Sequence, residues 1–218
     1  MDIVVVATTV VFAYLLGTIP FGLLIARLYG VQDIRKHGSG NIGATTVWRL
    51  AGPKAAVWVY ILDISKGVVA VTVARFIHQT LLPHDILLVL AAVSAVVGNI
   101  FPFYLRFKGG KGVNTTLGAV VSLLPIEALI CVGLFAIVVA VTRYISLGSI
   151  IGACALCPVI LIEKYLFDKP VSVVYLYLSI LIGLVILVTH RQNIVRLLSG
   201  TESRFSFSSK SRHTESDV

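Results

Sequence analysis

Long apolar stretches decide what this chain can fold into. Six of them run for about 17–26 residues, the length at which an α-helix crosses the hydrocarbon core of a bilayer. They comprise residues 3–28, 55–76, 86–103, 126–142, 146–166 and 171–189. Because 57% of the 218 residues are hydrophobic and only 13% are charged, a water-soluble domain could not cover so much apolar surface. The sequence therefore predicts an all-α integral membrane protein, whose first stretch is a retained helix, since no basic segment precedes it.

A seventh apolar stretch, residues 113–124, is short and ends at Pro125. The distribution of Lys and Arg indicates whether it is a separate span, because positive residues gather on the cytoplasmic side of membrane proteins. Seven spans place most of the 18 Lys and Arg residues on one side, whereas six spans divide them more evenly. We therefore expect a bundle of seven transmembrane helices within residues 1–200, with the N-terminus outside and the C-terminus cytoplasmic. The polar, Ser-rich tail of residues 201–218 is expected to be a disordered cytoplasmic segment.

This topology places three polar segments together on the cytoplasmic side. The first contains Ser39 and Asn41, either of which can cap a helix that starts near Gly43. Arg49 follows almost two turns later and can reach back toward this loop. Ser39 is a candidate nucleophile, and the alternative is a hydrogen-bond donor or helix cap.

The second polar segment is a basic glycine loop formed by Lys108, Gly109, Gly110, Lys111 and Gly112. Glycines let backbone N–H groups approach an anion, and the lysines add positive charge, so the loop is typical of a phosphate site. It is not a nucleotide-binding P-loop, because a leucine stands at the first glycine position and a glycine follows the second lysine. The alternative for the lysines is that they only mark the cytoplasmic end of a span.

The third segment contains His190 and Asn193, which are three residues apart and would share a helix face. His190 can act as a general base or a phosphate donor, or it can be a histidine of the membrane interface. Asp63 and Lys66 lie inside the second span, where unpaired charges are costly. We expect them to neutralise each other and to brace the site.

The sequence predicts no metal or cofactor site. The ten acidic residues do not cluster, and Cys154 and Cys157 stand in an apolar run without further ligands nearby. The cysteines are interpreted as small packing residues.

These segments resemble the motifs of the bacterial acyl-phosphate:glycerol-3-phosphate acyltransferase (PlsY) family. The resemblance is carried by residues 39–45 with Arg49, by residues 101–113, by residues 190–202, and by residues 63–67. It extends over nearly the whole chain. The chain departs from the family pattern at three positions. It has Asn99 where the family has histidine, Thr46 where it has asparagine, and Asn114 where it has alanine.

The resemblance implies an enzyme of the bacterial cytoplasmic (inner) membrane whose active site faces the cytoplasm. It would move a fatty acyl group from acyl phosphate to the 1-hydroxyl of glycerol 3-phosphate without a covalent acyl-enzyme. The products would be lysophosphatidic acid and inorganic phosphate. Apart from these substrates and membrane lipids no partner is expected, neither nucleic acid nor an obligatory protein.

The hypothesis gives each segment a role. Glycerol 3-phosphate would be bound by Ser39, Asn41, Arg49 and Lys108, and the acyl-phosphate head by Gly109, Gly110, Lys111 and Gly112. His190 and Asn193, with Ser39, would be the catalytic residues, which position the hydroxyl while a substrate phosphate serves as base. Two other functions fit a basic membrane protein: a transporter for a phosphorylated metabolite, and a membrane subunit without catalytic activity.

Overall fold

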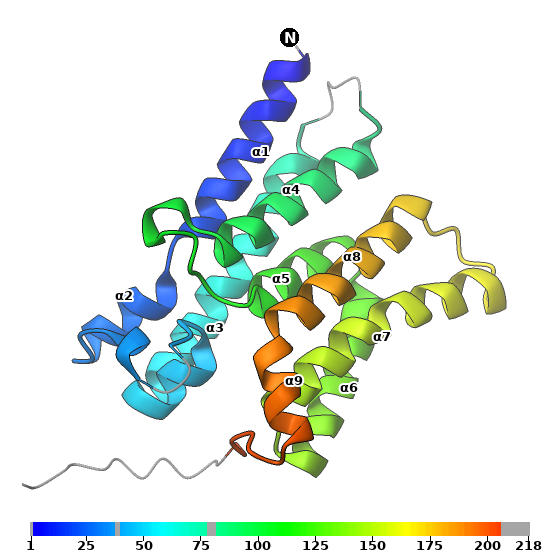
Figure 1. The fold of residues 1–218 in the computed structure, drawn as a ribbon. Helices are drawn as coiled ribbons and strands as arrows, with labels where there is room; N and C mark the ends of the chain where they lie inside the picture. The colour runs from blue at the N-terminus through cyan, green and yellow to red at the C-terminus, as the bar shows by residue number, and fades with distance from the viewer. Residues whose placement is uncertain (1, 38–39, 78–81, 206–218) are drawn as a thin grey trace, which may run out of the picture.

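A computed structural model describes residues 2–37, 40–77 and 82–205 of the chain (Figure 1). Over these residues the secondary structure is helical and contains no strand, which confirms the predicted all-α class. The helices are α1 Asp2–Thr18, α2 Phe21–Leu28, α3 Ala44–Arg75, α4 His84–Ile100, α5 Val113–Leu123, α6 Pro125–Thr142, α7 Ile145–Leu166, α8 Val173–Thr189 and α9 Arg191–Leu198, with the short 3-10 helices η1 Ile34–Lys36 and η2 Phe103–Leu105.

The first two helical regions differ from the predicted stretches. The first apolar stretch is divided into α1 and α2 at Pro20, because proline lacks the N–H group that a continuous helix needs. The second predicted stretch lies in α3, which begins at Ala44, well before the predicted start at residue 55. It contains a kink at Gly52, whose φ of 86° is left-handed, and it continues from Pro53. The kink separates a short polar first part of α3 from its long apolar second part.

The short seventh stretch forms a helix of its own, as predicted. α5 has 11 residues, and α6 starts at Pro125, since proline is favoured at the first position of a helix. At 1.5 Å per residue, α5 is about 16 Å long, roughly half the thickness of the hydrocarbon core.

The described part of the chain has five helical segments that are long and apolar enough to cross a membrane. α8 becomes a sixth candidate if it is counted together with α9, which bends away from it by 63°. α9 was not predicted from the sequence. The protein is therefore a helical membrane protein with several spans, and a count of seven stays a prediction that requires α5 to act as a span.

Close helix contacts place the start of α5 against the middle of α3. A Cβ atom on Gly67 would lie 2.1 Å from the carbonyl oxygen of Thr115, and one on Gly118 would lie 1.9 Å from that of Ile64. Only glycine fits at these two positions, so the two helix backbones touch. The loop that precedes α5 is thereby held beside α3.

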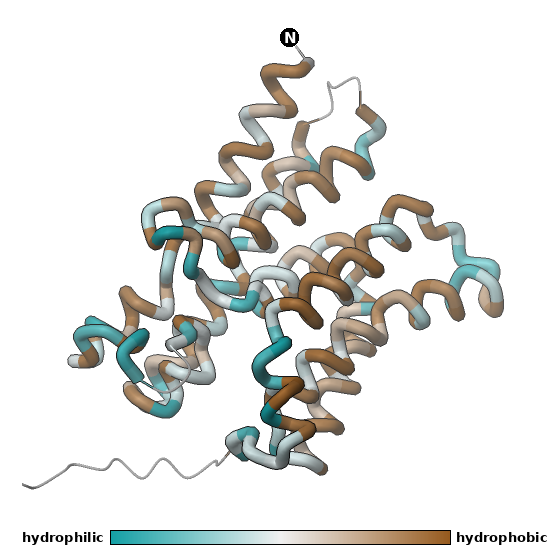
Figure 2. Tube along the Cα trace, viewed as in Figure 1, coloured by the Kyte–Doolittle hydropathy of each residue, from teal (hydrophilic) through white to brown (hydrophobic). Residues whose placement is uncertain are grey.

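The apolar core is divided into three clusters of buried residues. One joins α1, α4 and the end of α3, a second joins α2 and the first half of α3, and a third joins α5, α6, α7 and α8. Figure 2 shows hydrophilic residues at the loop before α5, at the α8–α9 bend and around η1, whereas the long helices are hydrophobic.

The first residues of the predicted tail contact the helices. The N–H of Phe205 donates to the carbonyl oxygen of Arg143 at 2.7 Å, and the rings of Phe205 and Trp48 are 5.1 Å apart. Residues 206–218 lie outside the described residues, so disorder of the tail stays a prediction.

Candidate active site

A cavity of about 400 Å³ lies where the three polar segments meet. The first segment contributes Asn41 and Arg49, and the third contributes His190 and Asn193. The second contributes residues 110–114, which include the first residues of α5. Apolar and small side chains of other elements complete the lining, among them Phe21, Phe135, Ile145 and Ser149. The cavity therefore joins a polar, basic region to an apolar wall.

The glycine loop is built differently from what the sequence suggested. The N–H groups of Gly109 and Gly110 donate to the carbonyl oxygens of Ile100 and Asn99, both at 3.0 Å. A Cβ on Gly109 would lie 2.1 Å from the Asn99 oxygen, so glycine is needed for close packing there. These two N–H groups therefore have partners within the protein, and a role for them in holding the acyl-phosphate head stays a prediction. Gly112 has a φ of 79° and directly precedes α5.

Lys111 is the cation of this loop that lines the cavity. Its Nζ donates a hydrogen bond to Oδ1 of Asn193, and its carbonyl oxygen accepts one from the hydroxyl of Thr189 at 3.4 Å. Burial lowers the pKa of Lys111 to about 8; the negative charge of Glu202 opposes this effect, and the positive charges of Arg196 and Arg49 add to it. Lys111 thus carries a proton at neutral pH but releases it more readily than an exposed lysine.

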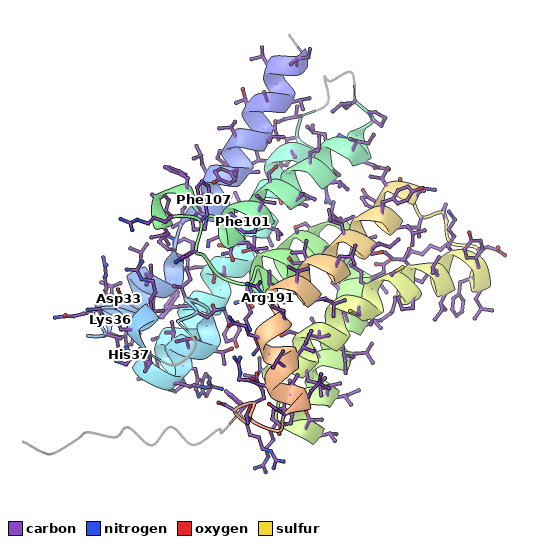
Figure 3. All side chains as sticks on the ribbon, viewed as in Figure 1. Asp33, Lys36, His37, Phe101, Phe107 and Arg191 are labelled. Atoms are coloured by element: carbon purple, nitrogen blue, oxygen red, sulfur yellow. The ribbon has the colours of Figure 1, made fainter. Side chains whose placement is uncertain are left out.

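Lys108 lies elsewhere. Its side chain is exposed, and it is not among the residues that line the cavity. Its predicted role beside Arg49 would require the side chain to turn toward the cavity. Figure 3 shows the aromatic residues Phe101 and Phe107 of the same loop, which lies ahead of α5. They are also exposed, at 49% and 61%.

Glu202 connects three residues around the cavity. Its Oε1 accepts hydrogen bonds from Nδ2 of Asn193 and from the hydroxyl of Ser146, both at 2.6 Å, and its Oε2 accepts one from Nε of Arg196 at 2.7 Å. Burial alone would raise the pKa of Glu202, but these hydrogen bonds outweigh it and lower the pKa. Glu202 is therefore an ionised carboxylate that orients Asn193, and Asn193 in turn contacts Lys111.

His190 lies at the bend between α8 and α9, and 2% of it is exposed. Its Nδ1 lies 2.9 Å from the carbonyl oxygen of Ile186, which can only accept, so Nδ1 carries the proton and Nε2 is an acceptor. Burial lowers the pKa of His190 to about 4, and the charge of Lys111 acts in the same direction. The imidazole is consequently neutral at neutral pH. Asn193 lies in α9, so the two residues do not share one continuous helix, although both line the cavity.

The first segment is placed partly as predicted. Oδ1 of Asn41 accepts a hydrogen bond from the N–H of Gly43 at 2.8 Å, and α3 starts directly after Gly43. Asn41 thus fixes the turn that leads into α3, and Arg49 follows on the same helix with an exposed side chain that lines the cavity. Ser39 lies outside the described residues. His37, near Asp33 and Lys36 in Figure 3, lies away from the cavity around η1.

Asp63 and Lys66 form the predicted buried pair. Nζ of Lys66 lies 2.6 Å from Oδ1 of Asp63, and 4.9 Å from the centre of the Phe21 ring. Lys66 is 1% exposed, and both members of the pair line the cavity. The pair therefore adds polar groups to the lining of the cavity without adding net charge.

Sequence reasoning did not predict the roles of Ser146 and Glu202. Ser146 is a common residue at the start of an apolar helix and carries no signal. Glu202 offered one, because it is the first acidic residue after Asp168 and follows several basic residues. A lone carboxylate in such a setting has cationic or hydrogen-bonding partners available.

Comparisons with known proteins identify relatives of this chain. The family model described as glycerol-3-phosphate acyltransferase matches residues 7–200. The glycerol-3-phosphate acyltransferase of Syntrophotalea carbinolica is 44% identical over 193 residues, which cover 88% of this chain and 94% of that protein. The one from Chlorobium phaeobacteroides is 38% identical over 221 residues, which cover 89% and 94%.

Solved structures show a similar fold. The crystal structure of PlsY, an integral membrane glycerol 3-phosphate acyltransferase, in its glycerol 3-phosphate form has a TM-score of 0.82 and 38% identity, and the match covers 92% of this chain and 96% of that one. For its lysophosphatidic acid form the TM-score is 0.80 and the identity is 37%, with 92% and 95% covered.

Proposed function

The chain belongs to the glycerol-3-phosphate acyltransferase family, and from this premise we propose that it transfers a fatty acyl group from acyl phosphate to the 1-hydroxyl of glycerol 3-phosphate. The products are lysophosphatidic acid and inorganic phosphate. The observation that carries the proposal is the one cavity in which Arg49, Lys111 and Asn193 adjoin an apolar wall. Two phosphate-bearing substrates, one of them with an alkyl chain, need this combination of cations and apolar surface.

The phosphate heads are assigned to the cations of the cavity. Arg49 binds the phosphate of glycerol 3-phosphate, since a guanidinium can donate two parallel hydrogen bonds to it. Lys111 and the first-turn N–H groups of α5 bind the acyl-phosphate head, because those N–H groups have no partner within the helix. Gly109 and Gly110 set the path of the loop. Ser39 and Lys108 stay assigned to glycerol 3-phosphate as predictions from the sequence.

The reaction is a direct displacement at the acyl carbon. The glycerol hydroxyl oxygen forms a bond to this carbon, the bond from the carbon to the bridging phosphate oxygen breaks, and phosphate leaves. The hydroxyl proton moves to a substrate phosphate oxygen. His190, which is neutral and has Nε2 as an acceptor, orients the hydroxyl with Asn193. Lys111 stabilises the negative charge that develops on the departing phosphate.

The membrane arrangement supports a site that faces the cytoplasm. Seven crossings, with α5 as the short fourth span, put the N-terminus outside and the three polar segments with most Lys and Arg residues inside. Thiol-reactive reagents that do not cross membranes should label cysteines placed at residue 54 and in the tail from the same side. Labelling from opposite sides would overturn the arrangement.

The decisive experiment uses the purified protein in lipid vesicles with palmitoyl phosphate and radiolabelled glycerol 3-phosphate. We expect lysophosphatidic acid and inorganic phosphate in a one-to-one ratio, and no product when palmitoyl-CoA replaces palmitoyl phosphate. Product from palmitoyl-CoA alone would refute the donor. Label that enters the vesicle lumen without becoming lipid would indicate a transporter.

A second measurement tests whether the acyl group is ever bound to the protein. Without glycerol 3-phosphate, intact mass spectrometry after mixing with palmitoyl phosphate should show an unmodified chain. A mass increase by one palmitoyl group that is lost in Ser39→Ala would show a covalent acyl-enzyme instead.

A further inference from the structure

The residues that follow α9 cross from one side of the cavity to the other. We call residues 201–205 the C-terminal strap. At its start, Glu202 is bound to Asn193, Ser146 and Arg196. In Figure 1 the strap is the red turn at the lower end of α9. The match to the family model ends at residue 200, before the strap, whereas the motif resemblance in the sequence extends to Glu202.

The end of the strap is attached to two different walls. The Phe205 N–H donates to the carbonyl oxygen of Arg143, in the connection between α6 and α7, at 2.7 Å. In the same connection, Nε of Arg204 lies 3.3 Å from the hydroxyl of Tyr144. The Phe205 ring meets that of Trp48, in the first turns of α3, at 5.1 Å with an angle of 57° between the planes. An aromatic contact of this kind adds to the stability that burial of the two rings provides.

These two walls are the ones that carry substrate-facing residues. Arg49 of α3 follows Trp48 directly, and Ser146 and Ser149 of α7 follow the connection that Phe205 contacts. Phe205 itself lines the cavity. The strap therefore forms part of the cavity wall between α3 and α7, and the aromatic side chain that it contributes, Phe205, is apolar.

An apolar wall at this place matters for a mixed anhydride. Water can attack the acyl carbon in the same way as the glycerol hydroxyl: its oxygen bonds to the carbon, the bond to the bridging phosphate oxygen breaks, and the products are fatty acid, phosphate and a proton. An enzyme that transfers the acyl group must exclude water from the cavity before the acceptor binds. We propose that the C-terminal strap, through Phe205 and Trp48, excludes this water and so selects the glycerol hydroxyl over water as the acyl acceptor.

The role of the strap rests on acyl phosphate as the proposed donor, and the experiment distinguishes a failure of the one from a failure of the other. Phe205→Ala and Trp48→Ala are measured with palmitoyl phosphate in the absence and presence of glycerol 3-phosphate. We expect phosphate release without acceptor to rise about tenfold in both variants, and the ratio of lysophosphatidic acid to phosphate to fall below one. Phe205→Trp should restore the wild-type ratio. Phe167→Ala, which removes an aromatic ring that is 71% exposed at the end of α7, is the matched control and should not change the ratio.

A second readout does not depend on the donor. In a variant whose three native cysteines are replaced by alanine, Ser149→Cys places a thiol on the cavity wall, at a position that is 7% exposed. A charged methanethiosulfonate reagent should modify this thiol about tenfold faster when Phe205→Ala is added, because the wall is opened.

The outcomes divide cleanly. Two results together would refute the proposal that the strap excludes water: unchanged labelling of the thiol introduced by Ser149→Cys, and unchanged hydrolysis in both aromatic variants. A different outcome is faster labelling when Phe205→Ala is added, while the wild-type protein neither hydrolyses palmitoyl phosphate nor makes lysophosphatidic acid from it. This outcome would refute palmitoyl phosphate as the donor and support the strap as a wall of the cavity. If Phe205→Ala does not fold, the milder Phe205→Leu decides, since it keeps an apolar side chain but loses the contact with Trp48.

Discussion

Glu202 and Glu127 are carboxylates held near opposite ends of α7. Glu202 accepts hydrogen bonds from three side chains, among them Arg196 at 2.7 Å. Glu127, in the first turn of α6, is 1% exposed and lies 2.8 Å from Nζ of Lys169, which also contacts Glu163 at 2.6 Å. Each carboxylate thus has a cationic partner and joins separate elements.

The two networks differ in what lies beyond them. From Glu202 the hydrogen bonds continue through Asn193 to Lys111, which faces a cavity. From Glu127 they lead, within the part of the chain that the structure describes, to Lys169 and Glu163, and none of these three residues lines the cavity. A buried ion pair alone therefore does not mark a site. A site needs a cation that is held in place and still has protons to donate toward an open volume.

The largest effect is expected at the cation that the first network holds. Lys111→Met should lower kcat/KM by about a thousandfold, because the departing phosphate loses its nearest positive charge. The thermal midpoint in detergent should change little. Lys164→Met, at the far end of α7, is the matched control and should keep full activity. A Lys111→Met enzyme with more than a tenth of wild-type activity would contradict the assignment.

Arg49 should show the next largest effect, and in a different kinetic constant. Arg49→Ala removes a charge-assisted pair with substrate phosphate, which contributes about 2 kcal/mol or more. We expect the KM for glycerol 3-phosphate to rise at least about 30-fold, while the KM for acyl phosphate changes little. Steady-state kinetics with each substrate varied in turn measure this. Equal changes in both constants would mean that Arg49 does not discriminate between the two heads.

The fold was largely predictable because the bilayer leaves few options. Apolar length and the Lys and Arg distribution predicted nearly every helix, including the separate α5 before Pro125. The kink at Gly52 and the bend before α9 were missed. A Gly–Pro pair can end a helix or bend it, and α9 is too short and polar to stand out from a tail. Such details depend on tertiary contacts that a local pattern does not contain.

The site was predictable in its residue types but less so in its geometry. The sequence indicated that Arg49, Lys111, His190 and Asn193 lie close together, and all four line one cavity. It did not indicate that Gly109 and Gly110 use their N–H groups within the protein. A glycine that binds an anion and one that packs against a carbonyl oxygen look alike in a sequence.

Glu202 should affect activity less than Lys111 and Arg49, through the pH profile. Its negative charge raises the pKa of Lys111, which burial holds at about 8. Because activity needs protonated Lys111, the wild-type rate should fall as the pH rises above about 8. Glu202→Gln removes the opposing charge, so this alkaline limb should move to lower pH, with about a tenfold loss of kcat/KM near neutrality. A loss of activity without a shift of the limb would assign Glu202 a purely structural role.

The smallest effect on catalysis is expected at the second network. Lys169→Met leaves Glu127 buried without its cation, which would cost several kcal/mol in a fully buried pair. Because 37% of the Lys169 side chain is exposed, solvent reduces this cost, and we expect about 1–2 kcal/mol. The thermal midpoint in detergent should therefore fall, while activity per folded molecule stays at the wild-type level. Adding Glu127→Gln should recover part of the stability, since it removes the more deeply buried charge and leaves that of Glu163, which also contacts Lys169, without a partner. If Lys169→Met instead lowered kcat and left the thermal midpoint unchanged, the Glu127 network would affect catalysis at the other end of α7. The contrast between a structural network at Glu127 and a catalytic network at Glu202 would then not hold.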